Sequence, residues 1–170
     1  MIRKATYDDV PVLMDIFRKA KDIMRKSGNL HQWNDGYPSE TIVREDIRAG
    51  HCYVLTDSEE YENEGKIIAT MAFIPGPDPT YSEIYDGMWP NDEPYYVIHR
   101  IAVAEPGHNA AKTLLDWGFK RAGTIRIDTH KDNMIMHHIL SKYGFTHCGK
   151  ILLAGGDPRE AYIGQYLENQ

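Results

Sequence analysis

The segment from Tyr95 to Phe145 constrains the fold most, because it reads as two strand–helix units in succession. It predicts a strand at Tyr95–Val103, a Pro-Gly turn, a helix at Asn109–Arg121, a strand at Thr124–Thr129 and a helix at Asn133–Lys142. Such a unit places a helix N-terminus beside the end of a strand, where free backbone N–H groups and the helix dipole attract an anion. The segment therefore predicts an anion-binding site.

Patterns on both sides of this segment predict a sheet with mixed pairing. Consecutive strands in the first half favour antiparallel pairing, and the later strand–helix–strand order favours local parallel pairing. We expect an α+β fold, with a central mixed sheet flanked by helices, in a single domain over residues 1–170. The flanking elements are a strand at Ile2–Ala5, an amphipathic helix after Thr6, a helix at Glu40–Ala49 after Ser39, strands at His51–Thr56, Lys66–Ile74, Thr146–Leu153 and Arg159–Tyr166, and an acidic hairpin loop at Asp57–Gly65.

Composition narrows the class of partner. The net charge of −6 comes with no cluster of lysine or arginine, which argues against nucleic acid or an anionic membrane surface. No apolar segment approaches the length of a membrane span. Cys52 and Cys148 form neither a metal-binding spacing nor a disulfide framework, so we expect a cytoplasmic protein without a metal.

Two irregular segments carry aromatic side chains of the kind that line binding sites. The rings in Ser27–Pro38 either line a site or cap the core. The long segment Pro75–Pro94 is rich in proline but too apolar for a disordered linker, so we expect it to fold over a site. The candidates for binding an acceptor are Trp33 and Tyr37 in the first segment, and Tyr85 and Trp89 in the second.

Four short motifs resemble the GNAT (Gcn5-related N-acetyltransferase) superfamily, and the resemblance covers essentially the whole chain. They are Ile98–Val103 (IHRIAV), Ile127–Asn133 (IDTHKDN), Lys142–Phe145 (KYGF) and the earlier Gln32–Pro38 (QWNDGYP). The resemblance implies that acetyl-CoA donates an acetyl group to the primary amine of a small molecule or peptide. It also implies direct attack of the amine in a ternary complex.

In that family, acetyl-CoA lies in a gap where two neighbouring parallel strands splay apart. The resemblance implies that backbone groups of Ile101, Ala102 and Val103 pair with the pantetheine arm. It also implies that Asn133, at the start of the second helix, contacts the pantetheine. Asn133 could equally serve as the helix N-cap, and both roles can hold at once.

The pyrophosphate turn departs from the family pattern of Arg or Gln, two residues, Gly, one residue, and Gly or Ala. These positions fall on Pro106, Asn109 and Ala111, and only Ala111 conforms. Because proline lacks an N–H and the turn is short, we expect weakened CoA affinity or a rearranged phosphate site. The remaining phosphate-side candidates are Gly107, His108, Asn109 and Ala110, together with Ala111.

His99 is the leading candidate for the general base. It lies four residues before Val103, as does a catalytic histidine of the arylalkylamine acetyltransferases, and strand parity places it on one face with Val97 and Ile101. Histidine side chains suit proton transfer near neutral pH. The alternative is a histidine that only satisfies neighbouring polar groups.

Other catalytic candidates are weaker. His130 either acts at the thioester or only shapes its turn, and Asp128 either acts as a base or serves in surface pairing. The tyrosine that usually acts as the acid in the family is replaced by Leu140, and Tyr143 lies in a different helical phase.

These departures leave other functions open. A GNAT-fold protein that has lost catalysis could bind a ligand or a partner, as the altered turn and Leu140 indicate. An edge strand or exposed aromatic rings could also serve a homodimer. Binding of acetyl-CoA separates the enzyme from the ligand-binding protein, and sedimentation tests the dimer.

Overall fold

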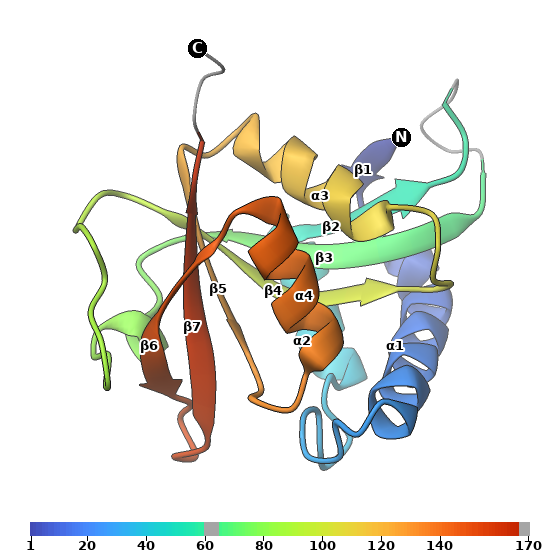
Figure 1. Ribbon diagram of the computed structural model, residues 1–170. Helices are drawn as coiled ribbons and strands as arrows, with labels where there is room; N and C mark the ends of the chain where they lie inside the picture. Colours follow the sequence, from blue (N-terminus) through green and yellow to red (C-terminus); the bar gives the residue numbers. More distant parts are fainter. Residues whose placement is uncertain (60–64, 167–170) are drawn as a thin grey trace.

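A single mixed sheet forms the centre of the computed structural model, which describes residues 1–59 and 65–166 (Figure 1). Within this part the strand order is β1-β2-β3-β4-β5-β7-β6. The expected α+β architecture with a mixed sheet is confirmed; of the loop expected at Asp57–Gly65, residues 60–64 lie outside the described part. The elements are β1 (Ile2–Lys4), α1 (Val10–Lys26), α2 (Glu40–Arg48), β2 (Cys52–Thr56), β3 (Ile67–Pro75), β4 (Tyr96–Val103), α3 (Ala110–Phe119), β5 (Thr124–Thr129), α4 (Met134–Tyr143), β6 (Thr146–Leu152) and β7 (Pro158–Gln165), with short 3-10 helices at Tyr7–Asp9 and Pro79–Tyr81.

Parallel pairing occurs between β4 and β5, as the strand–helix–strand pattern predicts. The pair is short, because only Tyr96 with Ile125 and Val97 with Arg126 are in register. By contrast, β5 pairs with β7 along its whole length. From Ile98 onward, the edge of β4 that faces β5 is therefore unpaired, and the two strands diverge.

Helices cover both faces of the sheet and enclose two hydrophobic cores (Figure 1). Leu114 of α3 and Leu140 of α4 belong to the core on one face, with Ile98 and Ile125 of the central strands. Leu13 of α1 and Val43 of α2 belong to the core on the other face. Burial of these periodic apolar positions fixes which face each helix presents to the sheet.

Local signals in the sequence set the helix ends. The carboxylate of Asp9 accepts the backbone N–H of Thr6 at 2.8 Å, which is half of a capping box before α1. Ser39 Oγ accepts the N–H of Ile42 at 3.2 Å and caps α2. Gly144, with φ of 106°, ends α4 in the left-handed conformation that glycine adopts without strain.

A β-bulge at Arg100 changes the parity of β4. Ala102 lies opposite Thr70, whereas His99 lies opposite Ala72, so β4 carries one extra residue and Arg100 has φ of 52°. His99 contacts Tyr81, but Ile101 packs with Ile98 in the opposite core. The predicted grouping of His99 and Ile101 on one face is therefore wrong, because the extra residue reverses the alternation.

The bulge directs Arg100 into a partly buried ion pair. Its guanidinium donates to both carboxylate oxygens of Asp46 on α2, at 2.7 and 2.8 Å, and to the hydroxyl of Tyr37 at 2.9 Å. Burial alone would lower the pKa of Arg100, but these bonds raise it above its usual value. The pair thus connects α2 and the segment Ser27–Pro38 to the strand that borders the gap.

Removing the Asp46 carboxylate tests this connection. Because Asp46→Ala leaves the partly buried guanidinium without its charge partner, we expect the free energy of unfolding to fall by about 1.5–3 kcal/mol, the range for hydrogen bonds to charged groups. The measurement is urea denaturation, with Asp15→Ala as control, since Asp15 pairs with Arg18 on the exposed surface of α1. The control should change stability by less than about 1 kcal/mol. Equal effects of the two variants would contradict the connecting role.

Candidate active site

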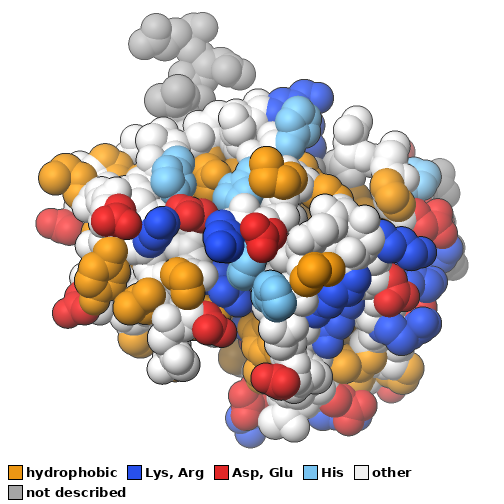
Figure 2. Space-filling view, turned by 60° about the horizontal axis from the view of Figure 1, so that its bottom comes forward, with side chains coloured by type: hydrophobic (Ala, Val, Ile, Leu, Met, Phe, Trp, Pro, Cys, Tyr) orange, Lys and Arg blue, Asp and Glu red, His pale blue; other side chains and the backbone are white. Residues whose placement is uncertain are grey.

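A cavity of about 440 Å³ lies where β4 and β5 diverge. Its wall comes from these two strands, the segment Ser27–Pro38, the start of α4, the segment Pro75–Pro94 and the hairpin between β6 and β7. Figure 2 turns the lower end of Figure 1 forward and shows acidic, basic and histidine side chains intermixed across the middle of that face. The cavity thus joins the strand gap to a polar surface.

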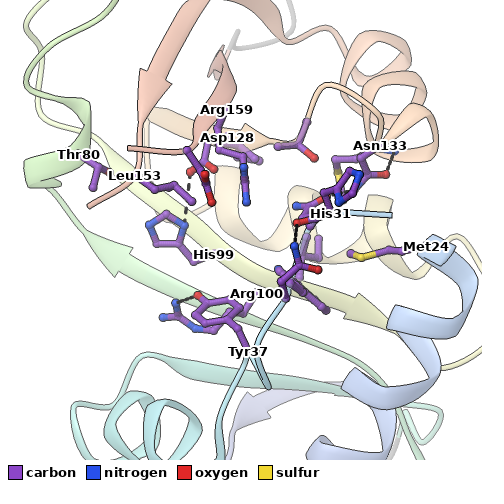
Figure 3. Close-up of a pocket in the computed structure, with 18 of the residues that line it drawn as sticks. Met24, His31, Tyr37, Thr80, His99, Arg100, Asp128, Asn133, Leu153 and Arg159 are labelled. Atoms are coloured by element: carbon purple, nitrogen blue, oxygen red, sulfur yellow. Dashed lines mark hydrogen bonds and ion pairs between the residues drawn. The ribbon is translucent and has the colours of Figure 1, made fainter. Parts of the chain in front are cut away.

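One end of the cavity lies beside the start of α4. Figure 3 shows Met24, His31 and Asn133 at this end. Thr129, on the diverging part of β5, has a buried hydroxyl without a hydrogen-bond partner among the described residues. An orphaned hydroxyl beside an unpaired strand edge is consistent with a ligand that supplies the missing polar groups.

Asn133 connects two segments at this end. Its Oδ1 accepts the N–H of Met136 at 3.1 Å, and its Nδ2 donates to Gln32 Oε1 at 2.9 Å. Gln32 Oε1 also accepts Asn29 Nδ2 at 2.8 Å. The N-cap function of Asn133 is therefore present, and its side chain also fixes the early aromatic segment against α4.

The other end of the cavity is built around His99. Its Nε2 lies 2.8 Å from Asp78 Oδ2, and its Nδ1 lies 3.8 Å from Asp128 Oδ2. Asp128 accepts the hydroxyl of Tyr81 at 2.6 Å. Asp78 also accepts the backbone N–H and the hydroxyl of Thr80 at 2.9 and 2.7 Å. Each carboxylate near His99 is thus held by a neighbouring donor.

The local electrostatics favour an ionised carboxylate at Asp78. Burial by itself raises the pKa of Asp78, but hydrogen bonds from His99 and Thr80 outweigh it and lower the pKa to about 2. Burial, with the adjacent Asp128 carboxylate, raises the pKa of Tyr81 well above its usual value, so this hydroxyl keeps its proton. This end of the cavity therefore suits a positively charged group such as an ammonium.

The two aromatic segments contribute differently from the sequence-based expectation. Trp33 and Tyr37 line the cavity, whereas Tyr85 and Trp89 do not. Trp89 donates its indole N–H to Tyr81 O at 2.9 Å and packs against the Arg126 guanidinium. It holds the Pro75–Pro94 segment in place, and that segment contributes Asp78 and Thr80 instead. Tyr85 is exposed and donates its hydroxyl to Glu83.

His130 shapes its turn. Its Nδ1 accepts the backbone N–H of Asp132 at 3.0 Å, and the ring lies beside His31. Burial and the nearby Arg159 charge lower the pKa of His130. His130 does not line the cavity.

The phosphate turn has an unusual conformation. Gly107 has φ of 99°, and Asn109 is left-handed at the N-cap of α3 with no side-chain cap. His108 is exposed beside Glu105, whose carboxylate lies 3.3 Å from Lys66 Nζ. Ala102, Ala110 and Ala111 are buried, and Val103 ends β4. Glu105 places a negative charge on the turn, consistent with the rearranged phosphate site that the sequence predicts.

Comparison with known proteins identifies the family. The model of the acetyltransferase (GNAT) family matches residues 13–145. The chain belongs to this family. Membership of the GNAT family implies acyl transfer from an acyl-CoA. No curated protein matches the chain.

Solved GNAT structures share the fold. A GNAT acetyltransferase from Streptococcus agalactiae is 31% identical, with a TM-score of 0.88 over 99% of this chain and 96% of that one. One from Listeria monocytogenes is 19% identical, with a TM-score of 0.70 over 98% and 94%. A chain of the NatC complex bound to Gag peptide and CoA is 13% identical, with a TM-score of 0.62 over 98% of each.

Three residues that line the cavity have no sequence signal that marks them as site residues. Asp78 lies in a proline-rich segment without a periodic pattern, and Arg159 reads only as the start of a strand. Gln32 is part of a recognised motif, but its bond to Asn133 spans 101 positions. Among residues 1–59 and 65–166, no helix is long and apolar enough to cross a membrane, and no group of three metal-ligating side chains is found.

The pKa of Asp78 predicts how stability responds to acid. A carboxylate with a pKa near 2 in the folded state, against about 3.9 in the unfolded chain, stabilises the fold above pH 4. This contribution, about 2 kcal/mol, is lost as the pH falls from 4 toward 2. Asp78→Asn should therefore be less stable than wild type at pH 6, and the difference should narrow in acid. Urea denaturation across this range measures it.

The control for this experiment is Asp22→Asn, at an exposed position of α1. Its stability difference from wild type should stay small and constant over the same range. A difference between Asp78→Asn and wild type that does not vary with pH would contradict the assignment.

Proposed function

We propose that this GNAT protein is an N-acetyltransferase that transfers an acetyl group from acetyl-CoA to the primary amine of a small molecule or peptide. The carrying observation is the pairing of His99 with Asp78 beside the unpaired edge of β4. Family membership supports the reaction class, and the geometry supports His99 as the base.

The bond to Asp78 determines which nitrogen of His99 can act. In a neutral ring, Nε2 carries the proton and donates it to Asp78, so Nδ1 keeps its lone pair. This Nδ1 faces Asp128 across 3.8 Å, a separation in which a substrate ammonium can contact both groups. His99 Nδ1 then takes a proton from the ammonium, directly or through water.

The deprotonated amine attacks the thioester carbon in a ternary complex. A C–N bond forms, the C–S bond breaks, and the sulfur leaves as a thiolate. The attacking nitrogen loses its remaining excess proton, and the thiolate takes up a proton, both through water. In this proposal, backbone N–H groups within Ile101–Val103 polarise the thioester oxygen, because β4 has no pairing with β5 beyond Val97. Leu140 is in the core and Tyr143 donates to Asp116 at 2.6 Å, so neither supplies the acid.

The donor side rests on several groups. Thr129 and the β4 edge offer polar partners for the pantetheine arm. Gly107, His108 and the N–H groups of Asn109, Ala110 and Ala111 form the phosphate end. Glu105 is paired with Lys66 at this end, so that lysine is engaged with a carboxylate rather than free for a phosphate.

Replacing His99 tests the proposed base. We expect His99→Gln to lower kcat about 10²- to 10⁴-fold, because the general base is lost. The dissociation constant for acetyl-CoA should stay within about threefold, a small binding-energy change. Turnover is measured as CoA release with a thiol reagent over a panel of amines, and binding by calorimetry. The control is His138→Gln, at an exposed position of α4.

Two outcomes would contradict the proposal at different levels. Unchanged turnover in His99→Gln would remove His99 as the base. If millimolar acetyl-CoA neither raises Tm nor gives calorimetric heat, the enzyme assignment fails. The altered turn at Pro106 to Asn109 would then favour the alternative of a GNAT-fold protein that binds another ligand or a partner.

A further inference from the structure

Arg159 is a buried cation in the wall of the active-site cavity. It belongs to β7 and is 8% exposed. Its guanidinium donates a hydrogen bond to the carbonyl of Pro158 at 2.9 Å, and it forms no ion pair with a carboxylate among residues 1–59 and 65–166. A guanidinium carries five N–H donors, so most of its hydrogen-bonding capacity is left over.

A second buried arginine, Arg126, shows how this fold stabilises such a charge, although its Nε has no hydrogen-bond partner among the described residues. The Arg126 guanidinium lies 4.1 Å from the Trp89 ring and 4.0 Å from the Tyr95 ring, and it donates to Asn91 O at 2.9 Å. Aromatic faces and a carbonyl thus receive the charge of Arg126. In the described part of the chain no aromatic ring stacks on Arg159, and its side chain lines an open cavity.

Strand register places Arg159 on the same side of the sheet as the candidate catalytic cluster. Asp128 lies directly opposite Ala161, and Arg159 precedes Ala161 by two residues, so the three share a face. Diagonal neighbours of this kind are about 7–8 Å apart. Figure 3 shows Arg159, Asp128 and His99 at one end of the cavity, with Thr80 and Leu153 beside them.

The acceptor end of the cavity therefore has two poles. Asp78 and Asp128 beside His99 form the negative pole, and Arg159, in a wall that Asp157 also lines, forms the positive one. An ammonium is attracted to the first pole and a carboxylate to the second, where a guanidinium can bind it through two parallel hydrogen bonds. This charge pattern fixes the direction in which a zwitterion can lie.

We propose that the acceptor is an amino acid: a small molecule that carries a carboxylate near its primary amine and binds it through Arg159. The inference rests on the proposed acetyltransferase function and narrows its substrate class. Asp128 holds the ammonium against His99 Nδ1, and Asp78 orients the ring through Nε2. Arg159 pairs with the carboxylate, which compensates the burial of its charge. A polyamine or a peptide N-terminus leaves the Arg159 charge unpaired in the ternary complex.

Matched acceptors test the inference on the wild-type protein. Each L-amino acid is compared with its C-terminal amide and its decarboxylated amine, with acetyl-CoA present, by CoA release. At least one free amino acid should exceed both analogues in kcat/KM by about 10- to 100-fold, the loss expected for a charge-assisted bond. Arg159→Gln should raise KM for that amino acid by a similar factor and leave the analogues within about twofold. Arg48→Gln, at an exposed position of α2, is the control.

Calorimetry with the same compounds and the CoA-loaded protein separates the two proposals. Amino-acid binding that Arg159→Gln weakens, without any turnover, supports the carboxylate site and contradicts the acetyltransferase. Turnover of amides or simple amines at rates equal to or above those of the free amino acids supports the acetyltransferase and overturns the carboxylate site. Absence of both turnover and amino-acid binding in the wild type overturns both.

Discussion

The early end of the β4–β5 pairing is the constraint on which the rest of the site depends. Two pairs hold the strands together at Tyr96 and Val97, and the strands diverge beyond them. Every backbone polar group that loses its sheet partner must find another. The bulge at Arg100 reverses the side-chain alternation of β4. His99 therefore faces the cavity beside Tyr81, whereas Ile101 packs on the core of the opposite face.

Polar contacts over long sequence distances keep this opening from collapsing. Arg100 holds α2 through Asp46, and Gln32 holds the start of α4 through Asn133. Both connections involve the segment Ser27–Pro38: Tyr37 accepts a hydrogen bond from Arg100 in the first, and Gln32 accepts one from Asn133 in the second. Buried polar networks of this kind are costly when incomplete, so they specify one arrangement of the surrounding elements. The cavity is thus preorganised by side chains that do not react.

Local patterns determined most of what could be predicted from the sequence. Alternation and helical period predict the strands and helices from Tyr96 to Tyr143 to within one or two residues at most ends, and the family motifs lead to His99 and to the strand gap. These patterns do not predict the bulge, because the extra residue at Arg100 does not change the residue types along the strand. Asp78 and Arg159 were missed for a different reason: their importance arises from tertiary contacts, and neither has a distinctive local neighbourhood. Trp89 is expected to line the site, but it packs against Tyr81 and Arg126 instead. The sequence alone does not distinguish these two roles of a tryptophan.

A crystal structure of the protein with acetyl-CoA tests the central claim most directly. We expect the pantetheine arm between β4 and β5, with hydrogen bonds to the backbone of Ile101 to Val103, and the thioester within reach of the His99 end of the cavity. The strand separation beyond Val97 should be unchanged on binding, since the side-chain network already holds it. Acetyl-CoA bound outside this gap, or a gap closed by further β4–β5 pairing, would contradict the account.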